Sequence, residues 1–401
     1  MTSPGIEAKL LPKNFEDTSI AFASKSDAQL RKMYLIFAIL NNNRLMNLGK
    51  SSLQLAFRLR LPVNWLVKKT VFEHFCGGES IEECGKAIKK LAEYNIGTIL
   101  DYSVEGEKNE AAFEATAQEV IRTIEKAAQA THIPFSVFKL TGIAPFELLQ
   151  KVQEKAQLSA EEEKQWQKVR ARLLHICQKA HDLQVQLLID GEESWIQDTI
   201  DTLCYEMMAR FNQKQAIIYN TYQMYRADML GNLQAAFAQA RQAGYFLGAK
   251  LVRGAYMEKE RARAAALQYP DPIQPDKAAC DRDFDAAVRF CMENIAYMGL
   301  CAGTHNEQSN LLLARLIDQA GLPHNDPRIY FAQLYGMSDQ ISYTLAQAGY
   351  NIAKYVPYGP VASVMPYLFR RAEENTSVAG QSSREFMLIK KERMRRKALH
   401  S

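Results

Sequence analysis

The chain has 401 residues, 47% of them hydrophobic, and can therefore bury a large core. Its 49 basic and 45 acidic residues leave a formal charge of +4, which is too small and too dispersed to predict nucleic-acid binding. The seven cysteines are scattered and form no CxxC pair, which indicates a reducing, cytoplasmic compartment. Residues 1–14 lack the apolar core of a signal peptide and the Arg/Ser bias of a transit peptide, so we expect neither.

Membrane contact is expected to be peripheral at most. The longest apolar run, residues 33–40, is much shorter than the ~20 residues that span a bilayer. A local excess of Lys and Arg lies between residues 384 and 397, beside the apolar residues 386–389. We expect this basic tail, residues 377–401, to be a frayed and solvated terminus, and the alternative is a weak contact with an anionic membrane.

The chain divides into an N-terminal helical region (residues 1–94), a barrel (95–376) and the basic tail. In the first region, Ser80 and Glu83 form a capping-box pattern that predicts a helix ending near Asn95. Beyond it, helical stretches separate apolar runs at residues 98–103, 134–141, 185–190, 216–221, 247–256, 299–305, 328–333 and 351–356. This rhythm predicts a (β/α)8 TIM barrel. A doubly wound open sheet is the alternative, but no GxGxxG follows the first strand.

Polar residues stand at the ends of nearly all the predicted strands. Buried parallel strands are usually apolar throughout, and barrel active sites are built at the carboxyl ends of the strands. The strand-end residues therefore predict a site, and they are Asp101, Lys139, Asp190, Asn220, Arg253, His305, Gln333 and Tyr355.

A helix is predicted after the turn at residues 358–360. Helical spacing places four polar side chains on one of its faces: Tyr367, Arg370, Arg371 and Glu374. Two adjacent arginines can hold one small carboxylate by charge-assisted, fork-like hydrogen bonds. The alternative is a solvated helix face with an Arg370/Glu374 ion pair.

Several chemistries have no matching motif. No HExxH or HxH spacing predicts a metal site, and neither GxSxG nor a Walker A motif is present. His305 is interpreted either as a structural histidine or as a ligand contact, and Lys139 as an ion-pairing residue, with a Schiff base as the alternative. Cations, carboxylates and tyrosines at the barrel mouth favour a small carboxylic acid bound beside a phosphate-bearing cofactor.

Four sequence strings strongly resemble the proline dehydrogenase (proline oxidase) family. They are KLVRGAY at residues 250–256, GTHN at 303–306, QLYGM at 333–337, and the segment 355–375, which ends in YLFRRAEEN. The resemblance covers about residues 95–376 and implies a distorted (β/α)8 barrel that binds FAD without a covalent bond. It also implies oxidation of L-proline to Δ1-pyrroline-5-carboxylate, with hydride transfer from proline C5 to flavin N5 and electrons passed to a quinone.

The resemblance implies roles for individual residues. The cations for the proline carboxylate would be Lys139, Arg370 and Arg371. Independently of the resemblance, Asp190 is expected to pair with cations at the barrel mouth because it is a carboxylate at a strand end. Glu105 would pair with Arg370 to close the site. The pocket walls would be Tyr355, Tyr367, Leu251 and Tyr256. The flavin-binding residues would be Asn220, Tyr222, Lys250, Arg253, Gly254, Lys277, Thr304, His305, Asn306, Gln333 and Glu374, and no metal is expected.

Two positions depart from many bacterial relatives, which have Arg at Lys250 and Gln at Asn220. Both changes resemble the eukaryotic-like branch of the family. Lys keeps the positive charge near flavin N5 but lacks the planar fork of Arg, so we expect a single or water-bridged contact there.

Two alternative functions stay open. In relatives that prefer hydroxyproline the position of Tyr355 is small, typically Ser, so a Tyr ring predicts proline over trans-4-hydroxyproline and disfavours a hydroxyproline dehydrogenase. A non-catalytic, proline-binding barrel is the other alternative, and the retained Lys139, Arg370, Arg371 and Tyr256 argue against it. In the catalytic reaction the amine must be neutral, and a cationic pocket disfavours its protonated form. We identify no protein base.

The expected partners are L-proline and a quinone, with peripheral contact with the inner face of the membrane. Functional coupling to a separate pyrroline-5-carboxylate dehydrogenase is also expected, because the remaining residues leave no room for an aldehyde-dehydrogenase domain. We expect a monofunctional, cytoplasmic protein of bacterial origin.

Overall fold

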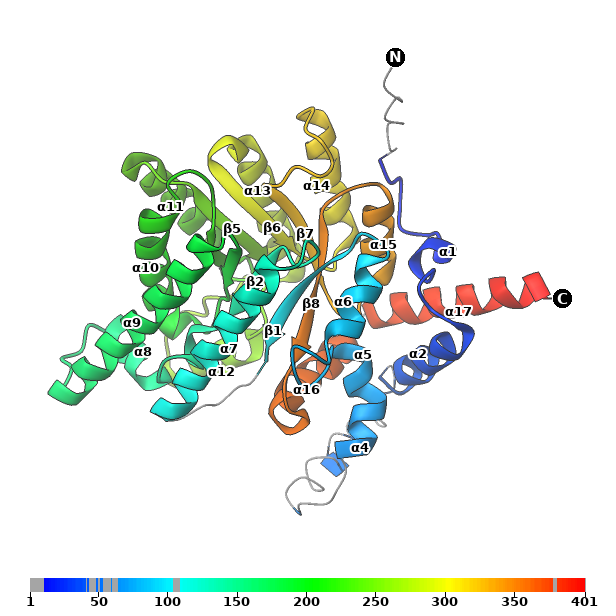
Figure 1. Cartoon of the computed structure of the whole chain (residues 1–401), viewed down its shortest axis with the longest axis horizontal. Coiled ribbons are helices and arrows are strands. Elements are labelled where there is room, and N and C mark those ends of the chain that lie inside the picture. The colour runs from blue at the N-terminus through cyan, green and yellow to red at the C-terminus, as the bar shows by residue number, and fades with distance from the viewer. Residues whose placement is uncertain are drawn as a thin grey trace.

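The structure is a computed structural model of the chain and describes residues 11–40, 42, 48–49, 51–52, 59, 64–103, 109–377 and 381–400. At its centre lies a closed barrel of parallel strands (Figure 1). The strands are β1 (Gly97–Tyr102), β2 (Phe135–Phe138), β3 (Gln186–Ile189), β4 (Ile218–Gln223), β5 (Leu247–Val252), β6 (Met298–Gly303), β7 (Ile329–Leu334) and β8 (Ile352–Tyr358). Each strand pairs with the next and β8 pairs with β1, which confirms the predicted (β/α)8 barrel and excludes the open sheet.

The strands bury side chains on both faces, which explains their nearly continuous apolar runs. One set of side chains, including Ile99, Val137 and Tyr219, packs inside the barrel. The alternate set, including Leu100 and Ile218, packs outward against the helices in a larger core. Because successive side chains point to opposite faces of a strand, this alternation decides which strand-end residues can reach the barrel axis.

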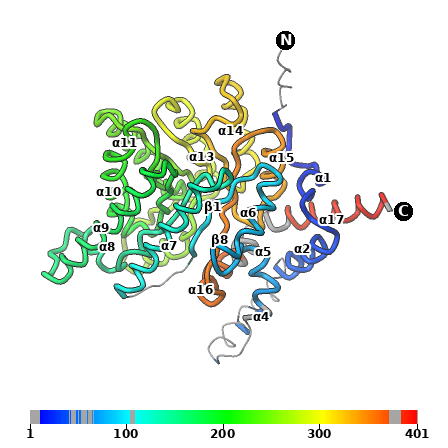
Figure 2. The backbone as a smooth tube through the Cα atoms, in the orientation of Figure 1, coloured from blue at the N-terminus to red at the C-terminus, as the bar shows by residue number. Residues whose placement is uncertain are grey.

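Helices follow the strands and cover the outside of the barrel (Figure 2). They are α7 (Glu110–Ala128), α8 (Phe146–Gln153), α9 (Ala160–Asp182), α10 (Ser194–Phe211), α11 (Met229–Ala243), α12 (Met257–Leu267), α13 (Lys277–Glu293), α14 (Glu307–Gln319), α15 (Asp339–Gln347) and α16 (Val361–Ser377), with short 3-10 helices η2 (Leu140–Gly142) and η3 (Ile295–Tyr297). A capping box opens α9: Ser159 Oγ accepts the N–H of Glu162, whose carboxylate accepts the N–H of Ser159.

The N-terminal region is helical where it is described. Its elements are α1 (Thr18–Ala21), α2 (Asp27–Leu40), α4 (Asn64–Val67), the π-helix η1 (Lys68–Phe72), α5 (Glu73–Phe75) and α6 (Gly85–Ala92). Ser80 Oγ accepts the N–H of Glu83 at 3.3 Å, but the helix predicted from Ser80 begins later, at Gly85. This region, called the arm below, packs through α1 on α15 and through α2 on α16.

The C-terminal residues form a helix, α17 (Gln381–His400), rather than the expected frayed tail. It lies beside α2, at the edge of the molecule away from α10 and α11 (Figure 1). Leu388 and Ile389 are fully buried against Phe22, Leu30 and Phe37 of the arm, so apolar burial holds the helix in place despite its basic outer face. None of the described helices is both long enough and apolar enough to cross a membrane.

Candidate active site

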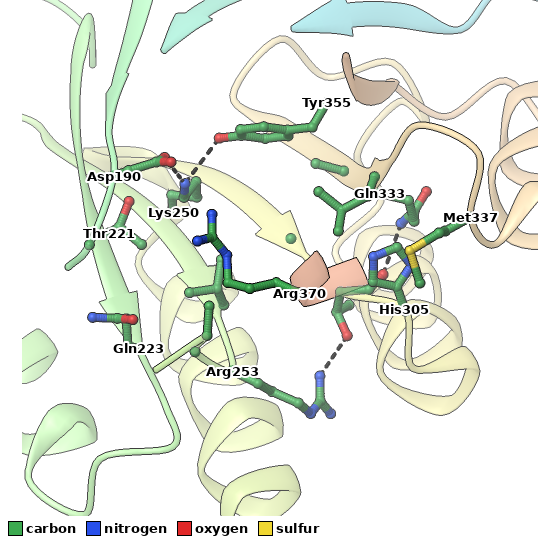
Figure 3. A pocket seen from close by; sticks show the side chains of 18 of the residues that line it. Asp190, Thr221, Gln223, Lys250, Arg253, His305, Gln333, Met337, Tyr355 and Arg370 are labelled. Carbon is green, nitrogen blue, oxygen red and sulfur yellow. Dashed lines mark hydrogen bonds and ion pairs between the residues drawn. The ribbon is translucent and has the colours of Figure 1, made fainter. Parts of the chain in front are cut away.

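A cavity of about 410 Å³ opens at the carboxyl ends of the barrel strands. Residues of all eight strands or of the loops that follow them, together with residues of α13 and α16, line it (Figure 3). The cavity brings together most of the residues expected from the sequence: Lys139, Asp190, Lys250, Arg253, Gly254, Tyr256, Lys277, Thr304, His305, Asn306, Gln333, Tyr355, Tyr367, Arg370 and Arg371.

Two lysines share one carboxylate at the bottom of the cavity. Asp190 Oδ2 lies 3.0 Å from Lys139 Nζ, and Asp190 Oδ1 accepts a short hydrogen bond from Lys250 Nζ. Lys250 Nζ also donates to Tyr355 Oη at 3.0 Å. Burial alone would raise the pKa of Asp190, but Lys250 and Lys139 outweigh it and hold the pKa below its usual value. Asp190 is therefore ionised and fixes both ammonium groups.

Asp101 is a second buried carboxyl group on the cavity wall. It accepts a hydrogen bond from Ser103 Oγ at 2.7 Å. Burial raises its pKa, and the nearby Asp190 carboxylate adds to this rise, while Lys139 opposes it. Because Asp101 keeps its proton more readily than Asp190 does, the cavity stays cationic overall.

Helix α16 supplies the second group of cations. Val364 and Leu368 are buried on its inner side, and they pack in a cluster with Phe72 and Phe75 of the arm. On the cavity side, the guanidinium carbon of Arg371 lies 5.0 Å from the ring centre of Tyr367. The guanidinium of Arg370 points toward Lys250 and Asp190 (Figure 3).

A third cationic region lies beyond β5. Arg253 donates to Asp281 at 2.7 Å, to Ser309 Oγ at 3.0 Å and to Thr304 Oγ1 at 2.5 Å. Lys277, in the first turn of α13, pairs with the same Asp281 carboxylate. Asn306 caps α14, so the first turns of two helices border this part of the cavity.

His305 follows Thr304, which Arg253 contacts, and it also lines the cavity. Its Nδ1 and Ser338 Oγ form a hydrogen bond of 2.9 Å. Burial lowers the pKa of His305 to about 3, and Lys354 and Arg371 add to the effect, so the imidazole is neutral. Gln333 donates to Thr304 O at 3.1 Å and accepts from Ser342 Oγ at 2.9 Å, which fixes it beside His305.

Three expected site residues do not face the cavity. Asn220 donates to Asp201 of α10 at 2.8 Å, the Tyr222 hydroxyl meets that of Tyr205 in α10 at 3.3 Å, and Leu251 packs in the outer core. All three stand on strand positions whose side chains point outward, toward the helices.

Their strand neighbours line the cavity in their place: Thr221, Gln223 and Val252. Thr221 Oγ1 donates to the carbonyl of Ile189 at 2.6 Å, and Gln223 donates to that of Glu192 at 2.7 Å. Side chains alternate between the two faces along β4 and β5, and this alternation is the sequence signal that identifies these residues.

Four further residues line the cavity although the sequence did not predict them: Met337, Leu334, Ala332 and Gly191. Of the remaining expected residues, Glu105 and the side chain of Glu374 lie outside the described residues.

Among the residues that the structure describes, no group of three or more His, Cys, Asp or Glu side chains could hold a metal ion. The cavity is lined by cations, their carboxylate partners and tyrosines. Such an arrangement can bind an anionic small molecule, and the neutral imidazole and apolar wall suit a planar ring.

Comparison with known proteins gives the same picture. The family model described as proline dehydrogenase matches residues 84–384. Proline dehydrogenase 1, mitochondrial, from Dictyostelium discoideum is 32% identical, over 95% of this chain and 74% of its own length. The carbapenem antibiotics biosynthesis protein CarD from Pectobacterium carotovorum is 33% identical, over 80% of this chain and 83% of its own.

A solved structure has the same fold. It is proline utilization A (PutA) from Bdellovibrio bacteriovorus, inactivated by N-propargylglycine, with a TM-score of 0.70 and 19% identity. The alignment covers 90% of this chain but only 38% of the PutA chain. The family match covers the barrel and α16, where the cavity lies, and the relatives above extend the similarity over most of the chain. The chain belongs to the proline dehydrogenase family.

Proposed function

We propose that the protein oxidises L-proline to Δ1-pyrroline-5-carboxylate, the first step of proline catabolism to glutamate, with FAD as its cofactor. The observation that carries the proposal is the convergence of Lys139, Arg370 and Arg371 on one cavity with Tyr355 and Tyr367. Three cations suit the carboxylate of a small amino acid, and tyrosine rings suit its apolar ring. Membership of the family supports the same reaction.

The residues present fit FAD. Lys277 stands in the first turn of α13, and Arg253, just after β5, contacts Ser309 in the first turn of α14, so charge and helix N-termini combine as a pyrophosphate prefers. Gly254 has a φ of 128°, and a Cβ there would lie 2.5 Å from the ring of Tyr225. The backbone at Gly254 therefore lies directly against this ring, which only glycine allows. Lys250 and the neutral imidazole of His305 would border the isoalloxazine ring, and the side of the ring toward α16 would be left for proline.

The side chains of the site would then do three things. Arg370, Arg371 and Lys139 bind the proline carboxylate and hold the ring in one orientation, and such positioning supplies much of the acceleration of an enzyme. Their charge disfavours the protonated amine, so the amine proton is lost to water before the C–H bond breaks. When bound, FAD would supply the acceptor for the hydride that proline C5 loses as the C5=N bond forms. Tyr367 and Tyr355 limit access of water to this part of the cavity.

Anaerobic spectroscopy of the purified protein tests this proposal. We expect a yellow protein with flavin absorbance that bleaches when L-proline is added, and no bleaching with L-alanine as the control. A colourless protein that takes up no added FAD would contradict the cofactor and the reaction together. Bound flavin that L-proline fails to bleach would instead support the non-catalytic, proline-binding alternative.

Tyr355 is proposed to set the choice between proline and trans-4-hydroxyproline. Its ring lies on the cavity wall, held by the hydrogen bond from Lys250. We expect Tyr355→Ser to raise the ratio of kcat/KM for hydroxyproline to that for proline by about 10- to 200-fold, because removing bulk that crowds a substituent is worth ~1–3 kcal/mol. Tyr355→Phe keeps the ring and is expected to keep the wild-type ratio. Equal ratios in wild type and Tyr355→Ser would show that another residue sets this choice.

The electron acceptor is proposed to be a quinone, reached by peripheral contact with the inner face of the membrane, and coupling to a pyrroline-5-carboxylate dehydrogenase is proposed with it. The packed pair α2 and α17 supports this contact, since Leu35, Ile39, Met387 and Met394 are exposed on it beside Lys390. Several eukaryotic relatives are named mitochondrial, whereas a cytoplasmic location is proposed here. Sedimentation with phosphatidylglycerol vesicles tests the contact, and protein that stays in the supernatant would contradict it.

A further inference from the structure

We propose that the arm and α17 position one wall of the active site, and that Glu385 of α17 is a positioning residue that acts on His305 through Ser338. The wall in question is the loop between β7 and α15, residues 335–338, called the wall loop below. The inference rests on the proposed function, because Met337 of the wall loop and the neighbouring His305 would border the flavin.

The contact between Glu385 and the wall loop is direct and buried. Glu385 Oε1 accepts the backbone N–H of Ser338, and both residues are buried. Ser338 has a φ of 52°, a left-handed conformation that is uncommon for a residue other than Gly, Asn or Asp. The same residue bonds His305 through its hydroxyl at 2.9 Å. The N–H acceptor supplied by α17 therefore stabilises the conformation that aims the Ser338 hydroxyl at His305.

An ion cluster beside Ser338 ties the arm to the same loop. Asp339 Oδ2 lies 3.0 Å from Lys25 of the arm, and Asp339 Oδ1 lies 3.0 Å from Lys354 of β8. Lys354 also donates to the carbonyl of Met337, whose side chain lies next to His305 in the cavity wall (Figure 3). All three charged groups are largely buried, so each depends on its partners for stability. A segment outside the barrel thus completes the support of Met337.

A second contact from α17 reaches the cavity on the other side of His305. Arg384 donates to Glu307, in the first turn of α14, at 3.1 Å. The neighbouring Asn306 caps α14 and lines the cavity. Arg384 also pairs with Glu16 near the start of the described arm. Adjacent residues of α17, Arg384 and Glu385, therefore hold the two segments that flank His305.

The burial of Glu385 is costly, which argues for a specific role. Burial raises its pKa to about 8, although the N–H of Ser338 opposes the rise. Its second carboxyl oxygen, Oε2, has no hydrogen-bond partner. An apolar side chain would fill this position at less cost, so stability alone does not account for a carboxyl group. The Ser338 N–H needs an acceptor, and this need does account for a carboxyl group at residue 385.

The family model ends at residue 384 and begins at residue 84, so Glu385 and Lys25 lie outside the matched segment. The wall loop, in contrast, lies inside it. Contacts from outside the matched segment therefore help to fix the wall loop, which lies within it.

Paired substitutions at Glu385 test this inference. Glu385→Leu removes the acceptor for the Ser338 N–H, whereas Glu385→Gln keeps an acceptor of the same length. Glu392→Gln, two turns further along α17, is the matched control, since Glu392 is also buried but pairs with Arg395 and Arg396 and not with the wall loop. Two measurements are made on the full-length protein: amide hydrogen exchange of peptides that cover residues 335–342, without added flavin, and the Kd for FAD.

We expect Glu385→Leu to speed exchange in these peptides and to raise the Kd for FAD about tenfold, the loss that follows when a buried N–H has no partner. Glu385→Gln is expected to match wild type in both measurements. Glu392→Gln is expected to lower global stability, because it removes the charged partner of Arg395 and Arg396, but to leave the Kd for FAD and the exchange of these peptides under native conditions close to wild type. Unchanged exchange in Glu385→Leu, or equal changes in all three variants, would overturn the inference. If wild-type protein binds no FAD, the proposed function fails, but the exchange measurement still tests the contact between α17 and the wall loop.

Discussion

Replacing Arg370 or Arg371 by Met lowers kcat/KM for L-proline by about 30- to 5000-fold while leaving flavin content near that of wild type. Both guanidiniums line the cavity, and Arg371 is nearly fully buried against Tyr367. Met keeps most of the length and volume of Arg but cannot neutralise or hydrogen-bond a carboxylate. Losing one partner of a buried, charged hydrogen bond costs ~2–5 kcal/mol, which gives the range of rate factors above.

Arg393→Met is the matched control for this prediction. The guanidinium of Arg393 lies 4.2 Å from the ring centre of Tyr34, so it packs on a tyrosine as Arg371 does, but on α17 and outside the cavity. We expect its kcat/KM to equal that of wild type in steady-state assays. Protein that loses its flavin in Arg370→Met or Arg371→Met would move that arginine to the cofactor side of the site. An unchanged kcat/KM would remove it from the substrate site altogether.

The barrel could be predicted from the sequence because its strands carry two independent signals. A strand covered on both faces is usually apolar throughout, so β6 stands out as an apolar run. Polar residues then interrupt the run where the strand leaves the barrel, as Asp190 does after β3. Since parallel strands bring their carboxyl ends to one rim, residues far apart in the sequence could be expected in one site.

The family resemblance of short sequence segments did not predict which face of a strand each side chain occupies. Asn220, Tyr222 and Leu251 stand in strands that line the site, but each side chain points to the helices. Their alternate neighbours, among them Thr221 and Val252, reach the cavity. A shift of one residue reverses the face, so the register of each strand has to be known before a role is assigned.

The end of the chain shows a different limit. Lysines and arginines between residues 384 and 397 dominate the composition, which led to the expectation of a solvated tail. The helix forms because Leu388 and Ile389 find an apolar surface on α2, an element more than 300 residues earlier in the chain. Composition describes the outer face of such a helix, whereas its stability depends on a long-range contact.

Asp190→Asn is expected to destabilise the protein and to abolish most of its activity. The Asp190 carboxylate is the partner of both Lys139 and Lys250, and the two ammonium groups would otherwise repel each other in a buried site. An amide of the same shape carries no charge, so both lysines lose their counter-ion. Removing one member of a buried ion cluster costs ~3–5 kcal/mol. We therefore expect Tm to fall by several degrees in thermal unfolding, and kcat to fall at least tenfold because Lys139 and Lys250 are no longer fixed.

The control for Asp190→Asn is Asp271→Asn, which removes the carboxylate from an ion pair with Arg261 at 3.3 Å in which both side chains are about two-fifths exposed. Water replaces a lost partner at such a site, so we expect changes in Tm and kcat close to zero. The contrast separates the charge of Asp190 from the general effect of an Asp-to-Asn change.

If Asp190→Asn kept the wild-type Tm and kcat, the two lysines would not depend on this carboxylate. The neighbouring Asp101 would then have to be their partner. Asp101→Asn would then show the losses predicted for Asp190, because Asp101 is the other carboxyl group on this wall, and its pKa already responds to Lys139.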